Sequence, residues 1–297
     1  MPRRHDGRLA QVPPYRRMMP FLMRGRNEAA VYFEQILDVT RTQAWLDAHA
    51  AAGGGHATVF HVVLHALAGV LHERPRLNRF AVGRRLYDRR GVHLSFAAKK
   101  RMADDAPLAT VKREFPAGER FADMIAALGG AVDDARSDRP SSVDRELDVL
   151  LRLPGPLLDA AVGLLHRLDA WGLAPRALTD TDPMYASAFV ANLGSIGIDA
   201  AYHHLYEHGT CPLFVAVGRI QPRPLIDGAG AVVVRPTLAI RYTYDERIED
   251  GLYCARGLEL IQRRVEDPAA WLGAPDAVAG AAAAAAAATD SPRRSAR

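Results

Sequence analysis

The residues best suited to chemistry lie in the segment 242–251, YTYDERIEDG. Its pattern predicts the end of a strand, a short loop and the start of a helix, which is the arrangement of a catalytic loop. Among its carboxylates, Glu246 and Asp250 are the candidate catalytic residues, and Gly251 begins the helix. Cys254 lies in the first helical turn, where a thiol pKa can fall, although a buried structural cysteine is the commoner case.

A second pair of residues, His61 and His65, has the i, i+4 spacing with which a helix can bind zinc. No carboxylate or third ligand follows at motif spacing. Core or surface histidines are therefore favoured here, and no metal site is expected.

The surrounding elements must position the loop. Hydrophobic periodicity predicts strands at 29–40, 106–115, 184–198, 212–220 and 232–245. It predicts helices at 41–51, 56–74, 121–137 and 251–267, with Pro75 and Pro268 as terminators. Residues 84–100 are expected to form a hairpin with its turn near Asp88 to Gly91. This mixture predicts one α/β domain around a mixed β-sheet flanked by helices.

The segment 141–178 is helical and amphipathic, and Pro154 and Pro156 should break it into two helices. A helix pair packed on the core is favoured over a membrane-surface segment, because both faces carry mixed charge. We expect residues 1–17 to form an N-terminal arm, 18–271 the domain, and 272–297 a disordered Ala- and Arg-rich tail.

Composition excludes several classes of protein. The net charge of +4 is mild, and much of the basic excess lies at the two ends, which favours solvated tails over nucleic-acid binding. The two cysteines have no metal or redox spacing, which is typical of a reducing compartment. No signal peptide and no run long enough to span a membrane is visible. A cytoplasmic protein is expected.

Four motifs in order resemble one family. They are YFEQILDVT (32–40), a helix ending in Pro75-Arg76-Leu77-Asn78, the turn Asn192-Leu193-Gly194, and the strand ending in YDERIEDG. Over residues 15–270 this resembles the catalytic domain of dihydrolipoyl acyltransferases of 2-oxoacid dehydrogenase complexes, which shares the chloramphenicol acetyltransferase fold. The resemblance implies coenzyme A as a substrate and a homotrimer with active sites between subunits.

The family mechanism, as the resemblance implies it, uses a histidine in His-x-x-x-Asp-Gly to deprotonate a thiol. A Ser or Thr before Asn-Leu-Gly donates a hydrogen bond to the oxyanion, and the motif aspartate holds an arginine. Here Asp250, Gly251, Asn192 and Gly194 match that frame. Glu246 stands in place of the histidine and Ala191 in place of the hydroxyl residue.

Both departures affect the chemistry. A free glutamate titrates near ~4.3 and a thiol near ~8.5, so complete proton transfer costs roughly 5–6 kcal/mol. Burial would raise the pKa of the glutamate and the neighbouring Arg247 would lower it. Loss of the oxyanion donor removes another ~3 kcal/mol. Together they favour weak, altered or absent transfer.

A residue at another position could act as the base that deprotonates the thiol. The segment YHHLYEHGT places His203, His204 and His208 after the Asn-Leu-Gly turn, where they are candidate bases or subunit-contact residues. Ser195 offers a hydroxyl, four residues beyond the family position, and with Asn192, Gly194 and Gly251 it is a candidate binding residue.

Two functions remain open. One is an acyltransferase that takes acyl groups from acyl-CoA or from a carrier on another chain, because fewer than 20 residues precede the core and no lipoylation hairpin is visible. The other is a catalytically inactive relative that binds acyl-CoA or a partner, or serves as a trimeric scaffold.

Overall fold

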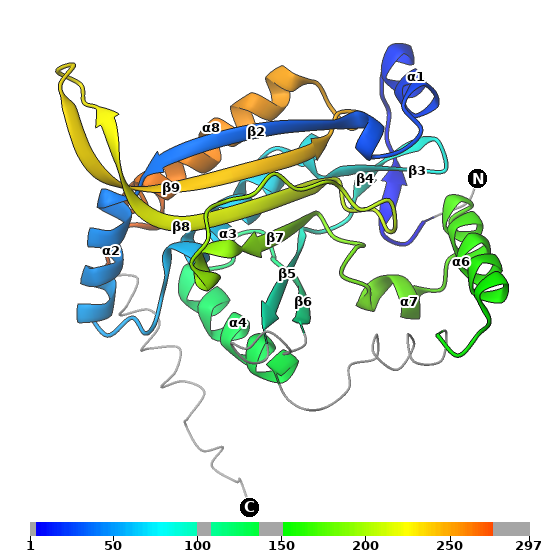
Figure 1. Cartoon of the computed structure of the whole chain (residues 1–297), viewed down its shortest axis with the longest axis horizontal. Coiled ribbons are helices and arrows are strands. Elements are labelled where there is room, and N and C mark those ends of the chain that lie inside the picture. Colours follow the sequence, from blue (N-terminus) through cyan, green and yellow to red (C-terminus); the bar gives the residue numbers. More distant parts are fainter. Residues whose placement is uncertain (1–3, 100–107, 137–150, 276–297) are drawn as a thin grey trace, which may run out of the picture.

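The computed structural model describes residues 4–99, 108–136 and 151–275. Its centre is a six-stranded mixed sheet (Figure 1). In spatial order the strands are β2 (Ala30–Asp38), β9 (Val232–Asp245), β8 (Leu213–Ile226), β7 (Ala188–Asn192), β5 (His93–Lys99) and β6 (Leu108–Glu114). The prediction of a mixed sheet flanked by helices is confirmed.

Strand direction changes within the sheet. β2, β9 and β8 pair antiparallel, whereas β7 runs parallel to both β8 and β5. Ala191 therefore lies opposite Ala216, and Ala216 lies opposite Arg241. These three residues form one row across the sheet. The row fixes where the Asn192-Leu193-Gly194 turn after β7 lies relative to the loop after β9.

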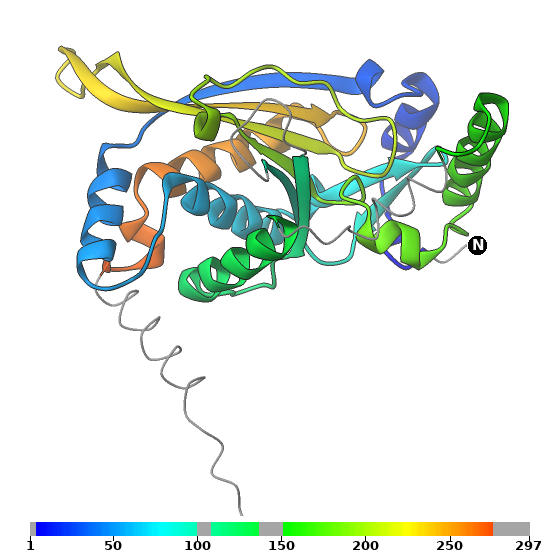
Figure 2. The ribbon, with the colours of Figure 1, turned by 60° about the horizontal axis from the view of Figure 1, so that its bottom comes forward.

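Helices cover one face of the sheet (Figure 2). They are α2 (Thr40–Ala51), α3 (Val59–Glu73), α4 (Phe121–Arg136) and α8 (Gly251–Glu266), followed by α9 (Ala269–Leu272). Alternation along β8 sends Leu213, Val215 and Val217 into the core beneath these helices. The intervening Phe214 and Ala216 face the other side, which the segment 198–211 covers.

A small second sheet joins the N-terminal segment to the domain. β1 (Gly7–Leu9) pairs with β4 (Arg85–Arg89), which pairs with β3 (Arg79–Val82). Gly83 and Arg84 both have positive φ, as a two-residue type I′ turn requires. The hairpin expected with its turn near Asp88 to Gly91 is wrong, since β4 and β5 belong to different sheets.

Helix α1 (Pro14–Leu22) follows β1 and packs beside β4, and Arg4 is buried against Asp169, so the N-terminal arm lies against the domain from residue 4 onward. Short 3₁₀ turns follow at η1 (Asn27–Ala29) and η2 (Pro75–Asn78). At the other end, the indole of Trp45 donates to the carbonyl of Gly273. Of the tail expected over 272–297, residues 272–275 are described and Leu272 ends α9, whereas residues 276–297 lie outside the described part of the chain.

Helices α6 (Gly155–Ala170) and α7 (Arg176–Thr181) lie at the periphery. Pro154 caps α6, as the expected break predicts, while the preceding helix of the pair falls mostly outside the described residues. Only Asp169 of α6 is buried, and Leu157 and Leu164 are exposed. The expectation that this segment packs on the core is therefore wrong for α6, which touches the body mainly through its C-terminal end. None of the described helices is long and apolar enough to cross a bilayer.

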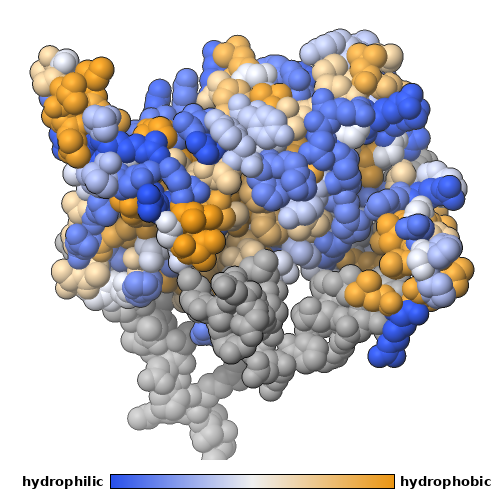
Figure 3. Space-filling model, in the orientation of Figure 1, coloured by the Kyte–Doolittle hydropathy of each residue, from blue (hydrophilic) through white to orange (hydrophobic). Residues whose placement is uncertain are grey.

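Strands β8 and β9 continue past the sheet as a two-stranded ribbon, residues 221–226 paired with 232–237. The ribbon protrudes at the upper left of Figure 1, and its tip is apolar in Figure 3. Ile226, Val232 and Val234 are each at least 70% exposed. An apolar strand pair that projects into water is typical of a contact surface.

Candidate functional site

The motif loop begins where β9 ends. Asp245 is fully buried, and both of its carboxylate oxygens accept from Arg247, over 2.8 Å from Nε and 2.7 Å from Nη2. Arg247 also donates from Nη1 to the carbonyls of Met23 and Arg24. The loop is thus fixed by a buried bidentate ion pair and tied to the segment after α1.

A second buried ion cluster holds the other end of the loop. Glu249 lies 3.1 Å from Arg79, 3.2 Å from Arg76 and 3.7 Å from Arg16. Its side chain is only 6% exposed. Three guanidinium groups compensate the desolvation of this carboxylate and join the loop to α1, η2 and β3.

This arrangement corrects the expectation for Asp250. In the described part of the chain no arginine lies within ion-pair distance of Asp250. The residue is exposed and caps α8, accepting from the backbone N–H of Tyr253 over 2.9 Å. That hydrogen bond lowers the pKa of the Asp250 carboxyl. The neighbouring Glu249 is the arginine-bound carboxylate, while Gly251 is exposed at the first position of the helix.

Glu246 lies between these two anchors and is half-buried. Its backbone N–H donates to Ala29, and its carbonyl accepts from Arg16 Nη1 over 2.8 Å. Within the described residues no hydrogen bond or ion pair engages its carboxylate. Arg247, expected to act on Glu246, is committed to Asp245 instead. The backbone at position 246 is fixed, but no described group orients the carboxylate.

The Asn-Leu-Gly turn is a compact structural element. Asn192 Oδ1 accepts from the N–H of Ser195, and the Ser195 hydroxyl donates back to the Asn192 carbonyl over 2.7 Å. The Ser195 hydroxyl, a candidate binding residue, is thus engaged within its own turn. Gly194 packs against the backbone of Gly218, where a Cβ would collide with the Gly218 carbonyl. These residues form the 3₁₀ turn η3 (Leu193–Ile196).

Ala191 packs on the apolar cluster that contains Phe189 and Phe214. It is in register with Arg241, and Glu246 lies five residues farther along, at the opposite end of the sheet. Strand geometry separates the Cα atoms of Ala191 and Glu246 by roughly 17 Å along the strands and about 10 Å across them. One chain cannot bring positions 191 and 246 to the same reacting bond.

His203 and His204 do not approach the loop as bases. The His203 ring stacks on Phe214 at 3.8 Å, and its Nδ1 lies 2.7 Å from the carbonyl of His204. His204 Nδ1 donates to the carbonyl of Leu205 over 2.9 Å. In the described structure neither ring is hydrogen-bonded to Glu246. Burial lowers the pKa of His203, which keeps the ring neutral in this stacked position.

A different histidine has an acidic partner. His208 Nε2 lies 2.6 Å from Asp182 Oδ2, and His208 Nδ1 lies 3.2 Å from His166 Nε2. The carboxylate favours the Nε2–H tautomer of His208, which leaves Nδ1 to accept from His166. Sequence reasoning singled out His208 but missed Asp182 and His166, which lie 26 and 42 residues away in the sequence. The chain provided no motif spacing that would have connected them.

The remaining candidates are structural. His61 closes a capping box with Thr58, and His65 donates to the carbonyl of Glu119 over 2.8 Å. No group of three or more potential metal ligands occurs in the described ranges. Cys254 is buried, and burial raises the pKa of its thiol to about 12, so it is not a thiolate near neutral pH.

These elements have known counterparts. Residues 175–273, which include both motif turns, match the family model of the 2-oxoacid dehydrogenases acyltransferase (catalytic domain). No curated protein matches the chain by sequence. The matched residues comprise β7, η3, β8, β9, the motif loop and α8.

Solved structures extend the similarity to the whole fold. A probable dihydrolipoamide acetyltransferase from Listeria monocytogenes is 18% identical, with a TM-score of 0.51 over 87% of this chain and 94% of that one. The dihydrolipoamide acetyltransferase of Azotobacter vinelandii is 19% identical, with a TM-score of 0.53 over 89% and 94%. A chloramphenicol acetyltransferase is 15% identical, with a TM-score of 0.51 over 88% and 98%.

The architecture is that of the chloramphenicol acetyltransferase-like α/β proteins. Within it, residues 175–273 carry the sequence pattern of the 2-oxoacid dehydrogenase acyltransferase catalytic domain. The resemblance inferred from the sequence is confirmed.

Proposed function

We propose that this chain binds an acyl thioester, either acyl-CoA or an acyl-dihydrolipoamide on another chain, in an acyltransferase frame whose catalytic groups are weakened. One observation carries the proposal. The loop that presents position 246 is held by two buried ion-pair groups, Asp245 with Arg247 and Glu249 with its arginines. The same loop presents a carboxylate with no described partner.

The chemistry at this position would begin with a thiol proton moving to the Glu246 carboxylate. The thiolate would then attack the thioester carbonyl, and the tetrahedral intermediate would expel the first sulfur as a thiolate, which takes the proton back. Carboxylates as a class are much weaker bases than thiolates, and no described group orients the carboxylate of Glu246 toward a thiol. Ala191 supplies no hydroxyl for the oxyanion. We therefore expect thioester binding with very slow transfer.

A comparison with the Azotobacter vinelandii enzyme supports the expectation of slow transfer. Its catalytic mechanism was investigated through a serine, a histidine and an asparagine. In this chain Glu246 and Ala191 replace the histidine and the hydroxyl residue expected from the family motif. The alternative, a relative that has lost catalysis and serves as a binding or scaffold protein, follows if transfer is absent while binding persists.

The proposal includes a homotrimer with sites between subunits. Positions 191 and 246 are at opposite ends of the sheet of one chain, so a shared site needs a second copy. The exposed apolar ribbon at Ile226, Val232 and Val234 offers a surface for that contact. Light scattering is expected to give three times the mass of one chain, and the mass of a single chain would contradict the assembly.

Calorimetric titration tests the binding step without requiring catalysis. Coenzyme A and acetyl-CoA should both bind the parent protein and the Glu246→Gln variant, since the substitution removes a base but no anchor of the loop. Arg16→Met should weaken binding, because it releases the Glu246 carbonyl and removes one partner of Glu249. A folded parent protein that binds neither acetyl-CoA nor an acyl-dihydrolipoamide would refute the proposal.

A further inference from the structure

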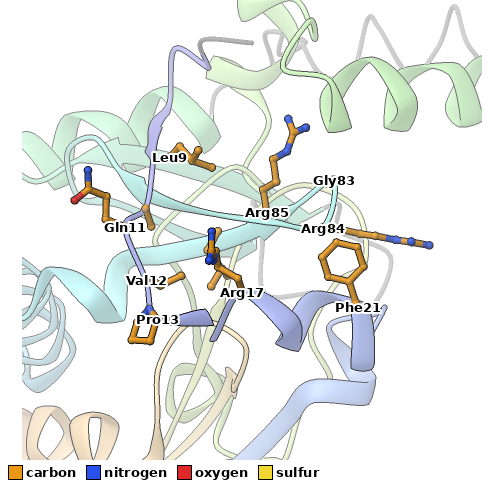
Figure 4. Close-up of a pocket in the computed structure, with 11 residues that line it drawn as sticks. Leu9, Gln11, Val12, Pro13, Arg17, Phe21, Gly83, Arg84 and Arg85 are labelled. Carbon is orange, nitrogen blue, oxygen red and sulfur yellow. The ribbon is translucent and has the colours of Figure 1, made fainter. Parts of the chain in front are cut away.

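A cavity of about 900 Å³ lies away from the motif loop, between the segment 9–13, helix α1 and the β3–β4 hairpin (Figure 4). Its size is within the range of small-molecule sites. Ala10, Val12 and Leu86 form an apolar cluster at its floor. Leu9 and Phe21, which are 42% and 49% exposed, form apolar walls.

The polar side chains around this cavity are mainly basic. Arg17, Arg84 and Arg85 line it together with Gln11, and none of the described residues that line it carries a carboxylate. All three arginines are exposed, and none has an ion pair in the described structure. Elsewhere, Arg79, Arg113 and Arg247, among others, pair with nearby carboxylates. The cavity thus combines an apolar floor with three uncompensated guanidinium groups.

The fold explains this combination. Arg17 and Phe21 are four residues apart in α1, so they lie on one face of the helix, and together with the N-cap residue Pro13 they line the cavity. Arg16 and Pro20 form the neighbouring stripe and are buried. Arg84 is at the tip of the type I′ turn, where its guanidinium lies 5.5 Å from the centre of the Phe21 ring. Figure 4 shows Arg84 and Phe21 side by side at one end of the cavity and Gln11 at the other.

We propose that this cavity binds an anionic amphiphile: one molecule with an apolar chain and a carboxylate or phosphate head. The chain would cover Leu9, Val12 and Phe21, removing exposed apolar surface from water. The head would accept charge-assisted hydrogen bonds from the guanidinium groups of these arginines. A neutral amphiphile would gain only the first contribution and inorganic phosphate only the second.

Calorimetric titration of the full-length protein with dodecyl phosphate below its micellar range tests the site. Dodecyl phosphate should bind, whereas dodecyl maltoside and inorganic phosphate should bind at least about tenfold more weakly. The double variant Arg17→Glu/Arg85→Glu should weaken dodecyl phosphate binding by about tenfold or more and leave dodecyl maltoside unchanged. Arg84 is retained because its guanidinium contacts the ring of Phe21, which forms an apolar wall of the cavity.

Arg8→Glu is the matched control. Arg8 is exposed on β1 next to Leu9, but it does not line the cavity, so the same charge reversal there should leave binding unchanged. Phe21→Ala should weaken both amphiphiles. Thermal unfolding of each variant establishes that it is folded, and hydrogen exchange should show ligand protection within residues 7–22 and 80–90.

Three results would overturn the proposal. The first is equal affinity for dodecyl phosphate and dodecyl maltoside. The second is an unchanged affinity for dodecyl phosphate in the folded Arg17→Glu/Arg85→Glu variant. The third is sedimentation with phosphatidylglycerol vesicles without binding of monomeric dodecyl phosphate, which would make this region a membrane-contact surface rather than a single-molecule site.

Discussion

The two ends of the central sheet differ in what holds them. The loop after β9 is fixed by buried charge, with Asp245 on Arg247 and Glu249 among three arginines. The turn after β7 is fixed by close backbone packing at Gly194 and by hydrogen bonds between Asn192 and Ser195. Neither end is held by the side chain of Glu246 or Ala191, the two positions at which we propose the chemistry would take place. Substitution at these two positions is therefore expected to leave the anchors of both ends intact.

The largest loss of stability should come from a substitution in the loop after β9, which buried ion pairs hold. Asp245→Ala leaves Arg247 buried without its carboxylate, and loss of one partner of a buried pair costs about 3–5 kcal/mol. Urea denaturation should show this decrease in the free energy of unfolding. Glu259→Ala, at an exposed position of α8, is the control and should stay within about 0.5 kcal/mol of the parent. A loss below about 1 kcal/mol for Asp245→Ala would mean that the pair does not hold the loop.

The stability of the turn after β7 should depend on side-chain volume rather than on charge. Gly194→Ala places a methyl group against the Gly218 carbonyl and should cost about 1–3 kcal/mol, measured in the same way. The matched substitution Gly163→Ala, in α6 with open space around it, should instead stabilise by about 0.5–1 kcal/mol. Equal effects of the two substitutions would contradict the close packing of η3 on β8.

The smallest effect concerns Asp250. Because it caps α8 and is not part of the ion cluster, Asp250→Ala should cost about 1 kcal/mol and Asp250→Asn less, since both Asp and Asn cap well. Its folded pKa is lowered, so its charge contributes stability above the unfolded value near 3.8 and loses it as pH falls through the folded pKa. Urea denaturation of parent and Asp250→Asn at pH 7 and pH 3 should therefore converge at low pH. A loss above about 2 kcal/mol for Asp250→Asn would restore the ion-pair role first expected for it.

Periodicity predicted the elements that form the core. The strands at 29–40 and 232–245 and the helix at 56–74 appear as β2, β9 and α3, because alternation and 3.6-residue spacing report directly which face is buried. The hairpin near Asp88 was wrong because turn residues do not reveal whether two flanking strands share a sheet. The true turn, Gly83-Arg84, places a non-glycine residue at positive φ, which turn propensity does not favour.

The site was harder to predict than the fold. The resemblance located the loop, but it assigned the arginine contact to Asp250, whereas the adjacent Glu249 points toward α1 and η2 and makes it. Which of two neighbouring carboxylates turns inward depends on partners far away in the sequence. The same limit applies to Asp182, His208 and His166, whose contacts exist only after α6 and α7 pack beside the segment 202–210.

We propose that the frame is retained while its catalyst is weakened. Transfer of an acetyl group from acetyl-CoA to dihydrolipoamide, followed as free coenzyme A separated by chromatography, tests this proposal. A free carboxylate is about 2 pKa units less basic than an imidazole, which is ~3 kcal/mol, and loss of the oxyanion donor removes another ~3 kcal/mol. Together they predict a rate more than about 10³-fold below that of a histidine enzyme. We expect equal traces of activity in the parent and in Glu246→Gln, and a gain in the double variant Glu246→His/Ala191→Ser. Robust activity in the parent that rises with pH and is lost in Glu246→Gln would contradict the account and identify Glu246 as a working base.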